Sequence, residues 1–117
     1  MDKYNSSGDF PMYVRIYWSK IYPGSWPAIE DRYNKLMQIP IEGLKARFVS
    51  QDVEDEESIF TITIWDKQES IVRWEASDAY REFLDQAMRP LTVGSQSVSL
   101  CKTRLYLIND LQPQTDV

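Results

Sequence analysis

Histidine is missing from this 117-residue sequence, and cysteine and glycine are scarce, with one and four residues respectively. Because histidine is the commonest acid–base group and metal ligand near neutral pH, its absence excludes hydrolysis by a Ser-His-Asp triad. The lone Cys101 excludes an intrachain disulfide. Without an imidazole to activate its thiol, we interpret it as a small buried side chain. The few glycines form no phosphate-binding loop, so nucleotide binding has no support.

Long apolar runs and clusters of positive charge are also absent. The chain has 18 acidic and 13 basic residues, a net charge of −5, and its Lys and Arg residues are scattered. Nucleic-acid binding needs clustered cations, so we expect no nucleic-acid partner. No apolar run approaches the ~18 residues of a membrane helix, and the start lacks a secretory pattern. We therefore expect a soluble, cytoplasmic protein without a membrane partner.

The length of the chain suits one domain. Polar residues with little to bury occupy both ends, which predicts flexible tails over residues 1–10 and 111–117. Residues 11–110 then form the predicted single domain. Within this domain, period-two alternation of apolar and aromatic residues predicts four strands, at residues 12–19, 44–49, 59–65 and 98–108.

Two segments have the apolar stripe of a helix. The first covers residues 25–40 and has proline near its start, where a missing N–H is harmless. The second covers residues 66–88. The spacing of Asp66 and Glu69 matches a capping box at its start, and Ser77 predicts a second N-cap within it.

Charged residues beside the second and third strands have two interpretations. The acidic run at residues 52–57 has the oxygen ligands of a hard cation, but a solvated loop between two strands is far commoner, and we favour the loop. We expect Arg47 and Arg104 to pair with carboxylates at the rim of the sheet. Exposed ion pairs of this kind add little stability.

The order strand, helix, strand, strand, helix, strand predicts the α+β class, with a ferredoxin-like βαββαβ fold and an antiparallel sheet. Both helices of that fold cover one face of the sheet. Each predicted strand has apolar or aromatic residues on both faces, which a lone sheet with one wet face does not need. We therefore predict a homodimer in which the two sheets pack face to face.

The residues from the third strand to the second helix have the spacing of a known family. The matching pattern is Trp65-Asp66, Ser70, Trp74, Ser77-Asp78 and Tyr80, preceded by Pro23-Gly24 and by Gly43. It resembles the antibiotic biosynthesis monooxygenase superfamily of dimeric α/β barrels, over roughly residues 12–108. The resemblance implies an obligate dimer with a hydrophobic pocket in each protomer, between the sheet and the helices.

One branch of this superfamily degrades haem. Its site consists of a helix tryptophan, a histidine ten residues later and a first-strand asparagine. Trp74 matches the tryptophan, but Leu84 stands at the histidine position, and the asparagine position falls near Tyr17. A leucine cannot ligate iron, so we expect neither a haem cofactor nor a metal.

The oxygenase branch implies a different site. Those relatives oxidise aromatic polyketides and quinols without a cofactor, so the pocket has to orient a flat ring, exclude water and assist one proton transfer. By this resemblance the expected ligand is a small aromatic phenol or quinol. The resemblance implies the catalytic residues Trp74, Tyr80 and Tyr17, and the substrate-binding residues Arg15, Trp18, Trp65 and Leu84.

Several alternatives stay open. Trp74 and Tyr80 lie on an apolar helix stripe, and such stripes usually pack into a core. The strand face with Arg15 and Tyr17 forms either the pocket wall or the dimer interface, and we favour the interface. A fold does not fix a function, so the second hypothesis is a non-catalytic dimeric module that binds a small ligand or a partner. Haem bound through Tyr, Cys or Met is the third.

Overall fold

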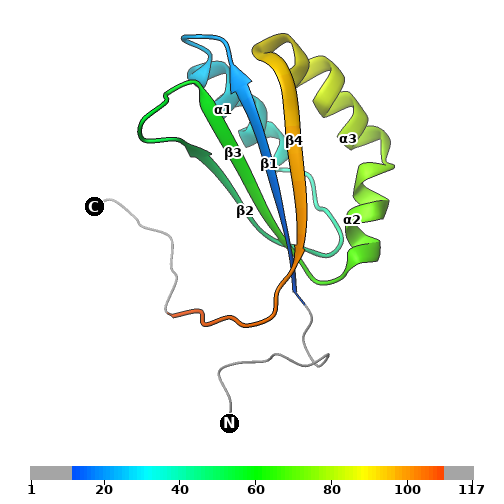
Figure 1. The fold of residues 1–117 in the computed structure, drawn as a ribbon. Helices are drawn as coiled ribbons and strands as arrows, with labels where there is room; N and C mark the ends of the chain where they lie inside the picture. Colours follow the sequence, from blue (N-terminus) through cyan, green and yellow to red (C-terminus); the bar gives the residue numbers. More distant parts are fainter. Residues whose placement is uncertain (1–11, 110–117) are drawn as a thin grey trace, which may run out of the picture.

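The structure is a computed structural model that describes residues 12–109 (Figure 1). Its elements are β1 (Tyr13–Ile21), α1 (Trp26–Leu36), β2 (Leu44–Gln51), β3 (Ser58–Trp65), α2 (Gln68–Glu75), α3 (Asp78–Glu82), η1 (Phe83–Met88), η2 (Arg89–Leu91) and β4 (Thr92–Lys102). Here η1 is a π-helix and η2 is a short 3₁₀ turn. The predicted tails at residues 1–10 and 111–117 lie outside the described residues.

The four strands form one antiparallel sheet in the order β2-β3-β1-β4. The helices lie together on one face of this sheet (Figure 1), so the predicted α+β class and ferredoxin-like order are confirmed. Because β3 lies between β1 and β2, its Thr63 pairs with Arg15 on one side and with Arg47 on the other. Side chains of paired residues share a face of the sheet. This row of three side chains therefore points toward the helices.

The hydrophobic core lies between the sheet and the helices. Helix α1 contributes residues at helical spacing. Strands β1 and β3 contribute residues near their ends whose side chains point toward the helices. The buried members of the core are Ile21, Ile29, Tyr33, Leu36, Ile59, Trp65, Ile71, Trp74 and Met88. These residues hold the two helical segments against one face of the sheet.

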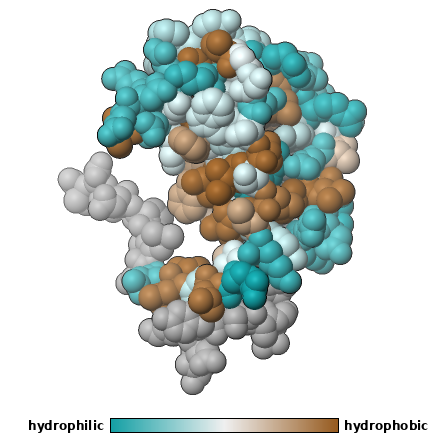
Figure 2. Space-filling view, in the orientation of Figure 1, coloured by the Kyte–Doolittle hydropathy of each residue, from teal (hydrophilic) through white to brown (hydrophobic). Residues whose placement is uncertain are grey.

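The opposite face of the sheet, here called the helix-free face, is apolar. Figure 2 shows hydrophobic side chains gathered over the strands on the side turned to the viewer. The apolar residues of this face are Val14, Ile16, Trp18, Ala46, Phe48, Phe60, Ile62 and Ile64. Ile62 pairs with Ile16 on one neighbouring strand and with Phe48 on the other. The described helices leave this face uncovered, and Phe48 is 41% exposed.

The start of the second helical segment differs from the prediction. Helix α2 begins after Lys67, whose side chain makes no capping hydrogen bond, so the predicted Asp66–Glu69 capping box is wrong. Asp66 instead accepts a hydrogen bond from the Ser70 hydroxyl, at 2.8 Å between Oδ1 and Oγ. The second predicted cap is confirmed, because the Ser77 side chain accepts from a backbone N–H at the start of α3.

Both edge strands of the sheet also differ from the prediction. An irregularity between Leu44 and Ala46 puts these two residues on opposite faces, although simple alternation places them together. Strand β4 begins six residues before the predicted position 98 and ends at Lys102. Cys101 is exposed on this strand, so the prediction that it is buried was wrong. An edge strand has a neighbour on one side only, which leaves its side chains more open to solvent.

Gly43 fits the start of β2 closely against the start of α2. Its backbone φ is +86°, in the left-handed region that favours glycine. A Cβ atom at this position would overlap the Ser70 side chain and lie 2.6 Å from the Asp66 Oδ1 atom. The Gly43 carbonyl also accepts a hydrogen bond from the Asp66 N–H, at 3.0 Å. This contact helps to fix the helices over the sheet.

Candidate functional site

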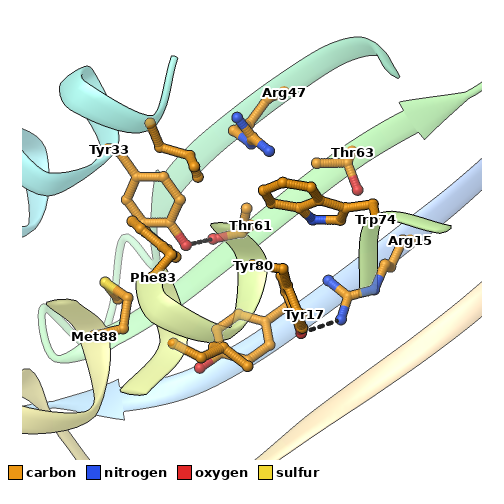
Figure 3. Close-up of a pocket in the computed structure, with 12 residues that line it drawn as sticks. Arg15, Tyr17, Tyr33, Arg47, Thr61, Thr63, Trp74, Tyr80, Phe83 and Met88 are labelled. Carbon is orange, nitrogen blue, oxygen red and sulfur yellow. Dashed lines mark hydrogen bonds between the residues drawn. The ribbon is translucent and has the colours of Figure 1, made fainter. Parts of the chain in front are cut away.

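A cavity of about 30 Å³ lies between the sheet and the helices (Figure 3). Its lining comes from strands β1 to β3, from the three α-helices and from η1. The strands supply guanidinium and hydroxyl groups, the helices supply most of the rings and aliphatic chains, and no carboxylate lines the cavity. One water needs roughly 10–15 Å³ of such space, so the cavity has room for about two waters.

A second cavity, of about 130 Å³, adjoins the first. Three residues line both cavities: Tyr17, Leu84 and Met88. The rest of its lining is Ser19, Arg89, Thr92, Gly94 and Gln96, which makes it the more polar of the two.

Strand β1 brings two predicted site residues to the first cavity. Arg15 and Tyr17 alternate with Val14 and Ile16, so they point toward the helices while their neighbours point to the helix-free face. Both are buried, with 8% and 5% of their surface exposed. Our preference for the dimer interface as the location of Arg15 and Tyr17 was therefore wrong.

Trp74 and Tyr80 reach the cavity from two helices that meet at Ser77. The Ser77 hydroxyl donates to the Trp74 carbonyl at 2.7 Å and accepts from the Tyr80 N–H at 3.1 Å. One hydroxyl therefore holds the end of α2 and the start of α3. The two aromatic rings lie edge to face, with 5.4 Å between their centroids and 64° between their planes.

The Arg15 side chain is held by two partners. Its Nε donates to Glu75 Oε2 at 2.7 Å, and its Nη2 donates to the Tyr80 hydroxyl at 2.8 Å. The guanidinium carbon also lies 5.5 Å from the centroid of the Tyr80 ring. Because the Tyr80 oxygen accepts the bond from Arg15, its own proton remains available for a ligand oxygen.

Two further tyrosines of the cavity are neutral at physiological pH. Burial raises the pKa of Tyr17 above its usual value. Burial raises the pKa of Tyr33 to about 12, and its hydroxyl forms a 2.9 Å hydrogen bond with Thr61 Oγ1. A tyrosine acts as a base when its pKa is depressed. The shifts have the opposite direction, so these hydroxyls suit hydrogen bonding rather than proton abstraction.

Arg47 lines the cavity, which the sequence interpretation missed. We predicted an ion pair at the rim of the sheet, but no described residue forms an ion pair or hydrogen bond with the Arg47 guanidinium, so that prediction was wrong. Burial lowers the pKa of Arg47, although the side chain stays protonated. Arg104, the other arginine of that prediction, is exposed.

The remaining predicted site residues separate into two groups. Leu84, from η1, lines both cavities. Trp18 lies on the helix-free face, where its Nε1 donates to Ser58 Oγ at 3.2 Å. Trp65 is only 1% exposed and donates to Thr63 Oγ1 at 2.8 Å, but it lies in the core beside the cavity rather than in its lining. Five of the seven predicted side chains therefore surround one space.

The acidic run has a structural role in the turn between β2 and β3. The Asp55 carboxylate accepts hydrogen bonds from Lys20 Nζ at 2.6 Å and from Ser58 Oγ at 3.0 Å. Asp52 accepts from the Glu54 N–H at 2.9 Å. Across residues 12–109, no three acidic or cysteine side chains come together as a metal site. Within the same residues, no helix has the length and apolarity to cross a membrane.

The sequence matches the family model described as antibiotic biosynthesis monooxygenase over residues 11–86, more than half of the chain. The chain therefore belongs to the antibiotic biosynthesis monooxygenase family, and the resemblance is confirmed. No protein of curated function matches the sequence.

Several solved structures share the fold. A conserved protein from Methanosarcina mazei Go1 is 14% identical with a TM-score of 0.71, and the match covers 80% of this chain and 94% of that one. A candidate antibiotic biosynthesis monooxygenase from Bordetella bronchiseptica is 12% identical with a TM-score of 0.70, covering 80% and 97%. Another candidate, from Chloroflexus aurantiacus J-10-fl, is 21% identical with a TM-score of 0.61, covering 77% and 92%. At such identities the likeness establishes the fold alone.

Proposed function

We propose that this protein is a cofactor-independent monooxygenase that oxidises a small phenol or quinol between the sheet and the helices. The Tyr80 hydroxyl carries the proposal. It accepts a hydrogen bond from Arg15 and keeps its proton for a ligand oxygen, beside the ring of Trp74. Membership of the family supports the class of activity.

In the proposed reaction the substrate ring supplies all the electrons. A phenol loses its hydroxyl proton, and the phenolate then passes electrons to O₂. In a phenol, one oxygen atom of O₂ becomes the second carbonyl oxygen of a quinone, and in a quinol it becomes the hydroxyl oxygen of a hydroxyquinone. In both reactions the other oxygen atom leaves as water with two hydrogens of the substrate. Phenol and O₂ therefore give quinone and water without an external reductant. Tyr80 stabilises the phenolate by donating a hydrogen bond, and Arg15 does so by its positive charge.

The cavity has to widen to hold a ring, because its 30 Å³ suits about two waters. The π-helix η1 forms one wall with the side chains of Phe83, Leu84 and Met88. Short π-helical turns occur frequently at functional sites. In the proposed complex these three side chains move aside, and the strands, which carry the polar groups, keep their places.

The proposal includes a homodimer joined through the helix-free face. Ile16, Phe48 and Ile62 lie side by side at the middle of this face, on three neighbouring strands. Apolar surface of this continuity is typical of an interface. A second copy brings the same patch about a two-fold axis, so the two sheets face each other. We place the dimer in the reducing cytoplasm, where Cys101 stays a free thiol.

Oxygen uptake with a panel of hydroquinones and anthrone-like substrates tests the proposed activity. We expect turnover above the rate without protein and one isotopically labelled oxygen atom from O₂ in each quinone. Tyr80→Phe should lower turnover about 100-fold, because it removes a hydrogen bond to the developing oxyanion. Tyr22→Phe is the matched control, since Tyr22 is 52% exposed and outside the cavity lining, and its turnover should be unchanged.

Two results would overturn the proposal. No uptake above the rate without protein, together with no binding by tryptophan fluorescence, would leave the cavity without a role. Binding without any turnover would identify a non-catalytic module that holds a small ligand.

A further inference from the structure

The two arginines of the first cavity differ in their partners. Arg15 donates to Glu75 and to Tyr80, so its charge is balanced and its position fixed. Arg47 has no carboxylate or hydrogen-bond acceptor among the described residues. The nearby hydroxyls have other partners, since Thr61 bonds to Tyr33 and Thr63 accepts from Trp65, and neither forms a hydrogen bond with Arg47.

The cavity is positively charged, although the protein as a whole has a net charge of −5. Two guanidinium groups and no carboxylate line it. The one compensating group, Glu75, lies outside the lining and is bound to Arg15. Burial lowers the pKa of Arg47, and the positive charge of Arg15 acts in the same direction. A half-buried cation without a partner is unfavourable for stability, which points to a ligand as the missing partner.

The strands set the distance between the backbones of the two arginines. Arg15 and Arg47 pair with the same residue, Thr63, from opposite sides of β3. Neighbouring strands lie about 4.8 Å apart, so the two arginine backbones are about 10 Å apart. The rings of Trp74 and Tyr80 line the same cavity as these two side chains (Figure 3).

We propose that Arg47 binds a carboxylate on the substrate, so that the ligand is an acidic phenol or quinol with its hydroxyl at Tyr80 and its carboxylate at Arg47. This inference rests on the proposed function and names the substrate class for the same site. A guanidinium donates two parallel hydrogen bonds to a carboxylate. These bonds would fix the orientation of the substrate ring and raise the affinity of the protein for the substrate. Arg47 thereby determines specificity, while Tyr80 contacts the reacting oxygen.

A matched pair of probes tests the role of Arg47. The first probe is 2,5-dihydroxybenzoate, and the second is its methyl ester, which has the same quinol ring without the negative charge. Calorimetric titration without oxygen gives both dissociation constants. We expect the wild-type protein to bind the acid at least about tenfold more tightly than the ester, because hydrogen bonds between charged groups are about twice as strong as neutral ones.

Substitution of Arg47 should remove this preference, because it weakens the binding of the acid much more than the binding of the ester. Arg47→Met keeps much of the apolar length of the side chain and removes the charge. Arg47→Lys keeps the charge but not the paired hydrogen bonds, so it should retain part of the preference and serves as a second variant if Arg47→Met does not fold. Arg104→Met is the control for net charge, since Arg104 is exposed and outside the cavity lining, and it should retain the whole preference.

The outcomes separate the two proposals. Equal affinity of the wild-type protein for the two probes, or a full preference in Arg47→Met, would overturn the role of Arg47 and leave the proposed oxidation standing. Absence of binding by either probe, together with absence of oxygen uptake across the phenol panel, would overturn the proposed function and this inference with it.

Discussion

The two faces of the sheet have opposite chemistry, and neither suits a sheet that works alone. The face under the helices carries guanidinium and hydroxyl groups at Arg15, Tyr17 and Thr63. The helix-free face carries Ile16 and Ile62 at corresponding positions one residue away. In a single antiparallel sheet the covered face is the apolar one and the other face is polar. At the middle of this sheet the arrangement is reversed, which fits a ligand on the covered face and a protein surface on the helix-free face.

Strand β3 shows this contrast within a few residues. Thr61 and Thr63 point to the helices, whereas Ile62 and Ile64 point away. Because successive side chains of a strand alternate, a shift of one residue in the pairing of β3 would exchange the two sets. The isoleucines would then fill the cavity, and the threonines would cover the interface. Both proposed roles therefore depend on one register.

A charge at the centre of the helix-free face should break the proposed interface. Ile62→Asp places a carboxylate from each protomer between the two sheets, where neither has a partner, so the dissociation constant of the dimer should rise at least about 100-fold. Analytical ultracentrifugation measures this constant. Val53→Asp makes the same change at a residue that is 96% exposed, and its dimer should be unaffected. A wild-type protein that is monomeric at micromolar concentration would contradict the prediction.

A side chain at position 43 should weaken the packing of α2 on the covered face of the sheet. The Cβ atom of Gly43→Ala would overlap Ser70 at the start of α2. The alanine would also have to adopt a left-handed backbone conformation. We expect the free energy of unfolding to fall by about 3 kcal/mol, from strain and displacement together. Gly24→Ala is the control, because Gly24 has a similar φ of +78° but no atom within 4 Å of the added Cβ. Its loss should be about 1 kcal/mol. Equal losses in urea unfolding would contradict the close fit.

The buried hydroxyl of Tyr33 should make stability depend on pH at alkaline values. Burial raises its pKa to about 12 in the folded protein, from 10.0 when unfolded. The contribution of the neutral Tyr33 hydroxyl to the free energy of unfolding is fully present below pH 10. It is lost as the pH rises toward 12, because the unfolded chain releases the proton first. The loss amounts to about 2–3 kcal/mol.

Denaturant unfolding at pH 9 to 12 compares the wild-type protein with Tyr33→Phe. The variant should lose stability less steeply in this window, since it has no proton to release at this position. Tyr22→Phe should follow the wild-type slope, because Tyr22 is half exposed. Parallel slopes for the wild-type protein and Tyr33→Phe would mean that this hydroxyl is open to solvent.

Alternation along β1 and β3 predicted which residues share a face, and the order of the elements predicted the fold. Alternation has a period of two and is symmetric, so it does not say which face the helices cover. The more apolar set, with Ile16 and Ile62, is the ordinary choice for a core, but in this sheet Arg15 and Tyr17 are the residues that face the helices. Trp74 and Tyr80, which belong to the family pattern, both line the cavity.

Other parts of the site depend on local irregularities that a pattern does not contain. Arg47 was missed because the irregularity after Leu44 moves the following residues of β2 to new faces. The start of β4 was hidden because Gly94, with a φ of +74°, lies inside the strand, where glycine usually indicates a turn. Cys101 has apolar neighbours in the sequence, which suggests a core position, but it is exposed because it lies on an edge strand.

The shared lining of the two cavities has a consequence for the size of the ligand. Tyr17, Leu84 and Met88 belong to both, so these three side chains form the partition between the smaller space and the 130 Å³ space beside it. Methionine has three rotatable bonds and adapts to irregular spaces, although Met88 is only 1% exposed and its neighbours have to move with it. In the proposed function, the side-chain torsion angles of two residues in η1 therefore set the length of the ligand, while the sheet that carries the polar groups stays the same for one ring or for two.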